Sequence, residues 1–172
     1  MKRFFLCLVI TLLASCGFHL RGIADLPGWL NNIAIVIQDA HHDLQNLLKD
    51  QLEAYKISIT NPAQANYLLI VEKDGFHQEI TNISASTAPR QYLLIYDVQF
   101  SLTQAKGRPL ISSSHVFVTR QITINNDRIL GSDAEEALLK SEMRADAAMQ
   151  IVNRLSQAKD SYAPKNLDNH AH

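Results

Sequence analysis

The chain has 172 residues, of which 47% are hydrophobic and 19% charged, with 16 basic against 17 acidic side chains. This composition predicts one globular domain and excludes a coiled coil and a disordered chain. A net charge of -1 argues against a nucleic-acid-binding protein, because such proteins neutralise phosphates with concentrated positive charge. Two cysteines are too few for a disulfide scaffold.

The first fifteen residues have the pattern of a secretory signal sequence. Lys2 and Arg3 precede an apolar run from Phe4 to Ala14, which is the arrangement of a segment removed from the mature protein. The run is about half as long as the roughly 20 residues that cross a bilayer. We therefore predict that residues 1–15 are a signal peptide and exclude them from the fold.

The end of this signal resembles a bacterial lipobox. Leu13, Ala14 and Ser15 directly precede Cys16, and Gly17 follows. The alternative is an ordinary small-residue cleavage site with an incidental cysteine. A lipobox implies that Cys16 is the lipidation site, where several acyl chains together make membrane attachment effectively stable. Bacterial lipoproteins that are retained in the inner membrane carry Asp directly after the lipidated cysteine, whereas this chain has Gly17. The resemblance therefore implies that the protein is sorted to the outer membrane and faces the periplasm.

Cleavage before Cys16 leaves 157 residues with 14 basic and 17 acidic side chains, a net charge of -3. Cys7 leaves with the signal, so no free thiol is expected for redox or metal chemistry and no disulfide can form. Residues 16–31 show no sustained hydrophobic period and are predicted to be a lipidated tether. Residues 32–158 are predicted to form a single α/β domain, and the polar residues 159–172 a disordered tail.

The first half of this domain predicts a strand, a helix and a second strand. Ile33, Ile35 and Ile37 alternate as in a half-buried strand. Residues 42–55 carry an apolar helical stripe, made of Leu44, Leu47, Leu48, Leu52 and Tyr55. A strand followed by a helix predicts a crossover to a parallel strand. We expect that strand to run from Tyr67 to Ile83 with a bulge at Gly75; a hairpin turn at Asp74 and Gly75 is the alternative.

A long antiparallel hairpin is predicted next. Alternate apolar residues mark its first strand: Tyr92, Leu94, Tyr96, Val98, Phe100 and Leu102. Residues 106–109 form the turn, and residues 110–124 return as a strand with Val116, Val118, Ile122 and Ile124 on one face.

The last predicted element is a long helix. Ser132, followed three residues later by Glu135, has the pattern of a capping box, and the helix should run to about Ala158. Its buried stripe is expected to contain Ala134, Leu138, Ser141, Ala145, Ala148, Val152 and Leu155. At ~1.5 Å per residue it would span ~40 Å, close to the length of the hairpin.

The predicted fold class is α+β, a two-layer α/β sandwich. A four-stranded mixed sheet carries two helices packed on one face, in the order βαβββα. The other face is then open, and its strands far exceed the usual five or six residues. An open face of this length suggests a surface that meets another molecule.

The seven histidines do not predict a metal site. His41 and His42 are adjacent and point in different directions, and His77 and His115 have no partner at a zinc-like spacing. Residues 112–114 are serines, but no nucleophile elbow or oxyanion turn accompanies them. The glycines are scattered and form no phosphate-binding loop. We therefore expect no catalytic residue, no cofactor and no metal.

Basic residues near the strand ends are the candidate binding residues. Arg90, Arg108 and Arg120 lie close to predicted turns, together with Lys106. Arginine forks suit phosphate oxygens, so these three arginines are candidate phosphate ligands. A solvated loop surface is the alternative.

Two stretches resemble one known family. Cys16-Gly17-Phe18-His19-Leu20-Arg21-Gly22 is similar to the opening of the lipopolysaccharide-assembly lipoprotein LptE family. The final helix is similar as well, in Leu130-Gly131, Asp133, Glu135-Glu136, Leu139, Glu142-Met143, Asp146 and Arg154-Leu155. Element order and length agree over nearly the whole mature chain.

The resemblance implies a non-enzymatic outer-membrane lipoprotein that plugs the barrel of LptD and helps deliver lipopolysaccharide (LPS) to the outer leaflet. A compact domain with polar faces suits a wide, hydrated barrel lumen. Some members are thought to bind LPS through basic residues near the sheet tip and before the last helix. Here those places hold residues 83–88 and Ser132, so Arg90, with Arg108 and Arg120, is the candidate LPS phosphate ligand. The alternatives are an LPS-binding periplasmic module without a barrel partner, and a periplasmic hydrolase.

Overall fold

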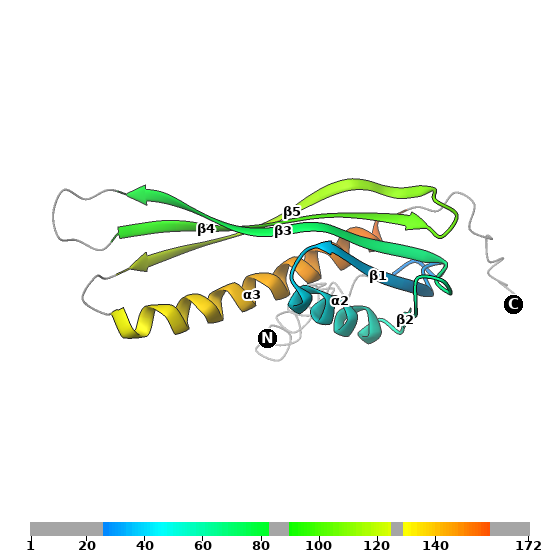
Figure 1. Cartoon of the computed structure of the whole chain (residues 1–172), viewed down its shortest axis with the longest axis horizontal. Helices are drawn as coiled ribbons and strands as arrows, with labels where there is room; N and C mark the ends of the chain where they lie inside the picture. Colours follow the sequence, from blue (N-terminus) through cyan, green and yellow to red (C-terminus); the bar gives the residue numbers. More distant parts are fainter. Residues whose placement is uncertain (1–25, 83–89, 125–128, 159–172) are drawn as a thin grey trace, which may run out of the picture.

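The computed structural model describes residues 26–82, 90–124 and 129–158. A five-stranded sheet carries α2 and α3 on one of its faces (Figure 1). The elements in chain order are β1 (Asn32–Asp39), α2 (His42–Ala54), β2 (Ser58–Ile59), β3 (Tyr67–Asn82), β4 (Arg90–Gln104), β5 (Pro109–Ile124) and α3 (Ile129–Ser156). The predicted α+β class is confirmed. The predicted signal peptide, Cys16 and the C-terminal tail lie outside the described residues.

The sheet has the order β2-β1-β3-β4-β5. β1 is parallel to both β2 and β3, whereas β3, β4 and β5 are antiparallel to one another. The predicted parallel crossover and the predicted long hairpin are therefore confirmed. The predicted strand count of four is wrong, because β2 adds a fifth strand at the edge. With two residues, β2 is too short to leave an alternation in the sequence.

β3 is one continuous strand, but its bulge lies elsewhere than predicted. Gly75 is paired regularly with β4, whereas the register shifts around Glu72, between Val71 and Lys73. An extra residue at this point reverses the alternation of side chains as far as Ile80, where a second register shift lies between Ile80 and Asn82. As a result Asp74 and Phe76 face the helices.

α3 differs from its prediction at both ends and along its first half. It begins at Ile129, before Ser132, and ends at Ser156. Leu138, predicted to be buried, is 62% exposed, and no side chain from residue 134 to residue 142 is fully buried. Among the side chains of α3 that the structure describes, from residue 134 onward, the buried ones lie in the second half of the helix: Met143, Ala147, Ala148, Ile151, Val152 and Leu155. That half packs against the core, together with α2.

The core lies between the helices and the middle of the sheet. Its centre is the predicted face of β4, where Leu94, Tyr96, Val98, Phe100 and Leu102 are fully buried. Burying each such side chain stabilises the fold by about 1.5–3 kcal/mol. Leu30 is 2% exposed, and the ring of Trp29 lies 5.0 Å from that of Tyr67. Residues 26–31, predicted as part of the tether, therefore pack against the domain.

Candidate functional site

The three candidate arginines lie at different places along the sheet. Arg108 belongs to the turn between β4 and β5, and Arg90 is the first residue of β4, at the opposite end. β5, with 16 residues, spans about 50 Å at ~3.3 Å per residue. The structure therefore does not bring Arg90 and Arg108 into one phosphate site. Only the backbone of Arg90 is described.

Arg120 lies between these ends on β5, opposite Leu94 of β4. Its guanidinium donates a hydrogen bond to the carboxylate of Asp146 on α3 and another to the carbonyl oxygen of Thr119, 3.0 Å away. The two charged side chains are 43% and 33% exposed. Arg120 thus connects the sheet to α3 in addition to presenting charge to solvent.

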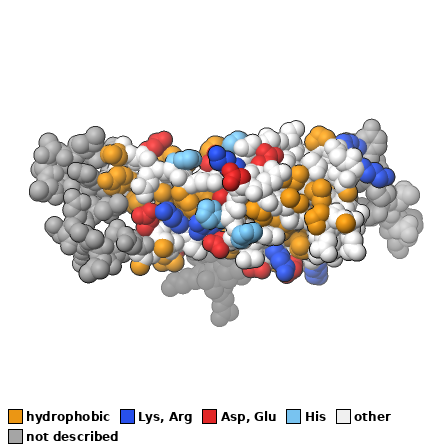
Figure 2. Space-filling view, viewed as in Figure 1, with side chains coloured by type: hydrophobic (Ala, Val, Ile, Leu, Met, Phe, Trp, Pro, Cys, Tyr) orange, Lys and Arg blue, Asp and Glu red, His pale blue; other side chains and the backbone are white. Residues whose placement is uncertain are grey.

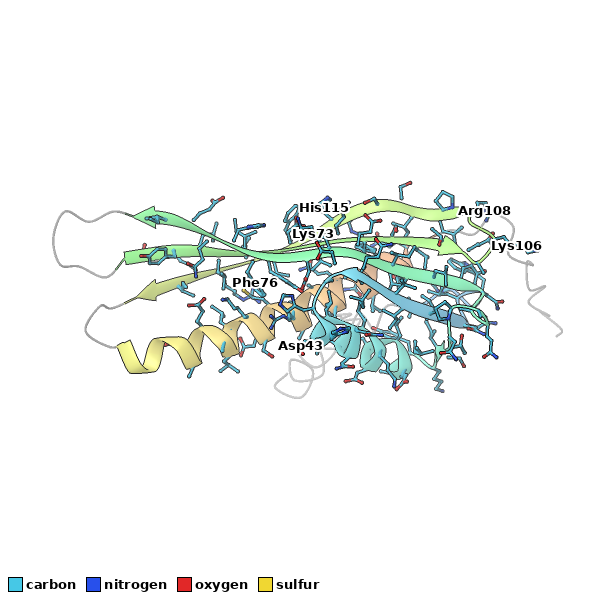
Figure 3. The ribbon with its side chains drawn as sticks, in the orientation of Figure 1. Asp43, Lys73, Phe76, Lys106, Arg108 and His115 are labelled. Atoms are coloured by element: carbon cyan, nitrogen blue, oxygen red, sulfur yellow. The ribbon has the colours of Figure 1, made fainter. Side chains whose placement is uncertain are left out.

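Arg108 and Lys106 place positive charge at the end of the β4–β5 hairpin (Figure 3). Gly107 between them has φ +86°, a backbone conformation that glycine adopts without strain. Its N–H donates to the carbonyl of Gln104, whose own N–H donates to the carbonyl of Arg108, both over 2.8 Å. The turn therefore holds the two basic residues on a closed, hydrogen-bonded backbone.

The open face of the sheet carries a polar network that crosses three strands. The Gln99 amide donates to the Ser113 hydroxyl, which donates to the carboxylate of Glu72, each over 2.7 Å. Hydrogen bonds from Ser113, Ser101 and Gln99 hold the pKa of Glu72 below its usual 4.5, because they favour the charged form. The bulge residue is thus an ionised carboxylate fixed on the open face.

His115 and Asp97 form a second polar pair on this face. The Nδ1 atom of His115 lies 2.9 Å from Oδ1 of Asp97, and the ring of Phe117 stacks on the imidazole with centroids 5.7 Å apart. Phe117 is 57% exposed. The open face of the sheet therefore presents mixed polar, charged and aromatic side chains. Figure 2 shows acidic, basic and histidine side chains together on a side of the molecule that the sheet shares with the helices.

A buried polar network, which the sequence analysis did not identify, lies on the helix-facing side. The side chain of Asp74 is 1% exposed. Its carboxylate accepts a hydrogen bond from the Tyr96 hydroxyl over 2.5 Å and one from the backbone N–H of His41 over 3.1 Å. His41 is the N-cap residue of α2, so a side chain of β3 caps this helix, where negative charge is favourable.

The hydroxyl of Tyr96 is held as a hydrogen-bond donor by its surroundings. Burial, with the adjacent Asp74 carboxylate, raises the pKa of Tyr96 well above its usual value. Its ring stacks on Phe76, with centroids 4.3 Å apart. On α3, the guanidinium of Arg144 lies 5.1 Å from the Phe76 centroid and the ammonium of Lys140 lies 5.5 Å from it. These cation–π contacts join α3 to the sheet.

This network could have been predicted from a correctly placed bulge. With the extra residue at Glu72, the alternation continues inward through Asp74 and Phe76, and a carboxylate on a buried face requires a partner. With the bulge predicted at Gly75, the sequence analysis did not place Asp74 on the buried face of the strand.

Neither a metal centre nor a membrane-spanning helix occurs in the part of the chain that the structure describes. Within residues 26–82, 90–124 and 129–158, no three His, Cys, Asp or Glu side chains are grouped so that they could bind a metal ion. Over the same ranges, neither helix combines the length and the apolar character needed to cross a bilayer.

Solved structures share this fold. A minor lipoprotein from Acinetobacter baumannii superposes with a TM-score of 0.64 at 18% identity, covering 76% of this chain and 97% of that one. An uncharacterised lipoprotein B from Nitrosomonas europaea gives a TM-score of 0.63 at 24% identity, covering 81% of this chain and 90% of that one.

Sequence relatives lead to one family. The LPS-assembly lipoprotein LptE of Pectobacterium atrosepticum is 27% identical over 161 residues, which are 92% of this chain and 86% of the relative. The LptE of Photorhabdus laumondii is 28% identical over 151 residues, which are 86% of this chain and 81% of the relative. The LptE family profile, described as lipopolysaccharide-assembly, matches residues 30–155. The chain therefore belongs to the LptE family of non-enzymatic lipopolysaccharide-assembly lipoproteins of the Gram-negative envelope.

Proposed function

We propose that this lipoprotein is anchored by lipidated Cys16 to the periplasmic side of the outer membrane, where it plugs the LptD barrel and assists its assembly. In this role it takes part in moving LPS to the outer leaflet. The observation that carries the proposal is the long sheet with its hydrogen-bonded polar face, combined with membership of the LptE family.

The shape and polarity of the domain suit the lumen of a large barrel. Membrane barrels present an apolar band ~25 Å tall to lipid and a polar interior. Strands of 15 and 16 residues reach about 50 Å at ~3.3 Å per residue, enough to fill such a lumen along its axis. The ionised Glu72 and the Asp97–His115 pair would tolerate a hydrated wall better than an apolar one.

Affinity purification from detergent-solubilised outer membrane tests this function. A tagged full-length chain should recover a large barrel protein in stoichiometric amount. A matched Cys16→Ser chain, which keeps the folded domain but lacks the lipidation site, separates the role of the anchor from that of the domain. Recovery of the lipoprotein alone would contradict the plug function, and mass spectrometry showing Cys16 without acyl chains would contradict the anchor.

A second candidate function is LPS binding through Arg90, Arg108 and Arg120. The position of Arg108 beside Lys106 on the hairpin turn favours it, because adjacent cations suit phosphate oxygens. Since Arg90 and Arg108 are at opposite ends of β4 and β5, each would contact a different phosphate. Charge reversal of all three arginines should weaken binding of purified LPS, and unchanged binding would refute this function.

A further inference from the structure

The outer edge of β1 is only partly covered by β2. The two strands pair at Asn32 with Ser58 and at Ile33 with Ile59. The carbonyl of Ile33 accepts the N–H of Thr60 over 3.0 Å, and there the ladder stops. β1, however, continues to pair with β3 on its other side as far as Asp39. The second half of β1 therefore has a paired strand on one side only, that of β3.

Backbone groups point outward along this uncovered stretch. Successive residues of a strand direct their N–H and C=O groups to opposite sides, so Ile35 and Ile37 follow Ile33 and point away from β3. In residues 26–82, 90–124 and 129–158, neither residue has a hydrogen-bond partner on that side. The backbone N–H and C=O groups of Ile35 and Ile37 thus form a row of two free donors and two free acceptors along the described edge of β1.

A cavity of about 680 Å³ lies beside this edge. Ile35 of β1 and Ile59 of β2 contribute apolar wall, and the rest is mostly polar. The polar lining comes from the exposed side of α2 and from the loop after β2: Gln45, Asn46, Lys49, Glu53, Thr60, Asn61 and Gln64. Figure 1 shows α2 and β2 on the same side of β1. The cavity is large enough for side chains of a short segment laid along the edge.

We infer that an extended segment of the barrel partner's own chain adds to the outer edge of β1, in line with β2, and places a side chain in this cavity. The inference rests on the proposed plug function, since a domain enclosed by a barrel meets the chain of that barrel. An extended backbone supplies acceptors and donors with the same two-residue spacing. The amides of Gln45, Asn46 and Asn61 favour a small polar side chain such as Ser, Thr or Asn.

The other edge of the sheet, on β5, fits such a segment less well. β5 begins with Pro109, which has no N–H to donate, and the register of its pairing with β4 shifts near Leu102. Proline and irregular register are devices that discourage strand addition. The sequence Ile35-Val36-Ile37 of β1 contains neither device.

Hydrogen exchange of the purified complex tests the inference within a single strand. The N–H groups of Ala34 and Val36 point towards β3, so they should exchange slowly both in the free lipoprotein and in the complex. Those of Ile35 and Ile37 should exchange fast in the free lipoprotein and at least about tenfold more slowly in the complex, because a new hydrogen bond protects an amide.

A pair of substitutions at one position provides the second measurement. Ile37→Pro and Ile37→Ala both remove the isoleucine side chain, which packs against the core. Only Ile37→Pro also removes the outward N–H, a change that edge strands accept, so the comparison of the two variants isolates that N–H. Loss of one hydrogen bond should speed dissociation of the complex up to about tenfold in Ile37→Pro relative to Ile37→Ala. Thermal unfolding of both free variants shows whether the domain itself is intact.

Each outcome has a separate meaning. If the barrel copurifies but Ile35 and Ile37 exchange equally fast in complex and free chain, the edge inference is overturned and the plug function stands. Protection that already exists in the free monomer, or that arises only on dimerisation of the lipoprotein, overturns it as well. If no barrel copurifies with the wild-type chain, the plug function itself fails.

Discussion

Tyr96→Phe is expected to destabilise the domain by removing a single buried oxygen atom. In the wild type that hydroxyl donates over 2.5 Å to Asp74, a carboxylate whose side chain is 1% exposed. The phenylalanine ring fills the same space, so no cavity is created. The variant therefore measures the hydrogen bond and not the packing of the ring on Phe76.

The expected magnitude follows from the charge of the acceptor. Hydrogen bonds to charged groups contribute about 1.5–3 kcal/mol, more than those between neutral groups. Asp74 keeps its bond from the backbone N–H of His41, so the carboxylate is not left without partners. We expect a loss of about 2 kcal/mol in the free energy of unfolding, which lowers Tm by roughly 8 °C for a domain of this size.

Urea denaturation at pH 7 measures this loss, with Tyr92→Phe as the matched control. Tyr92 lies on the same strand and has no hydrogen bond that the described residues show for its hydroxyl. Its replacement should change stability by less than ~0.5 kcal/mol. If Tyr96→Phe lost no more stability than Tyr92→Phe, the hydrogen bond from Tyr96 to Asp74 would not stabilise the fold.

Alkaline pH provides an independent check on the same hydroxyl. The pKa of Tyr96 is raised in the folded state above its usual value of 10.0, so the unfolded chain loses the proton first. The stabilisation that the folded state gains from the protonated Tyr96 hydroxyl is complete below about pH 10. It is lost as pH rises further, by up to about 1.4 kcal/mol per pH unit. Tyr96→Phe should lack this part of the alkaline loss. Parallel alkaline curves for the two proteins would refute the assignment.

Three further predictions concern the acid range, an ion pair and the core. The carboxyl of Glu72 should titrate below pH 4.5 by NMR, so its stabilisation is complete above that pH and lost as pH falls; a midpoint at or above 4.5 would contradict it. The double-mutant cycle of Arg120→Ala and Asp146→Ala should give a coupling energy under about 1 kcal/mol that weakens in salt. Ile151→Ala, in the core, should cost about 2–5 kcal/mol in urea denaturation, whereas Leu138→Ala, 62% exposed, should cost less than ~0.5 kcal/mol.

The parts of the fold that the sequence predicts well are those with a long hydrophobic period. The alternation along β4 and the stripe of α2 each bury one side of an element, and that requirement is visible in the residues themselves. The antiparallel hairpin follows from two such patterns joined by a short turn containing Gly107. The family resemblance, carried by the residues after Cys16 and by the last helix, agrees with the family profile.

The predictions that were wrong concern features that tertiary packing determines and that the local sequence does not. Leu138 fits the apolar stripe of a helix, yet the sheet under the first half of α3 does not bury it. The bulge was assigned to Gly75 because glycine often marks one, whereas the extra residue is Glu72, held by hydrogen bonds from another strand. The separation of Arg90 from Arg108 depends on strand direction and length, which a cluster of basic residues near predicted turns does not reveal.

The extra residue in β3 also determines which changes in chain length the domain can accept. A deletion of Glu72 would remove the residue without a partner on β4, so all side chains beyond it would keep their present sides. A deletion a few residues later, at Phe76 for example, would exchange the two sides of the strand as far as the second register shift, between Ile80 and Asn82. Single-residue deletions within β3 should therefore be tolerated only at one of its two register shifts.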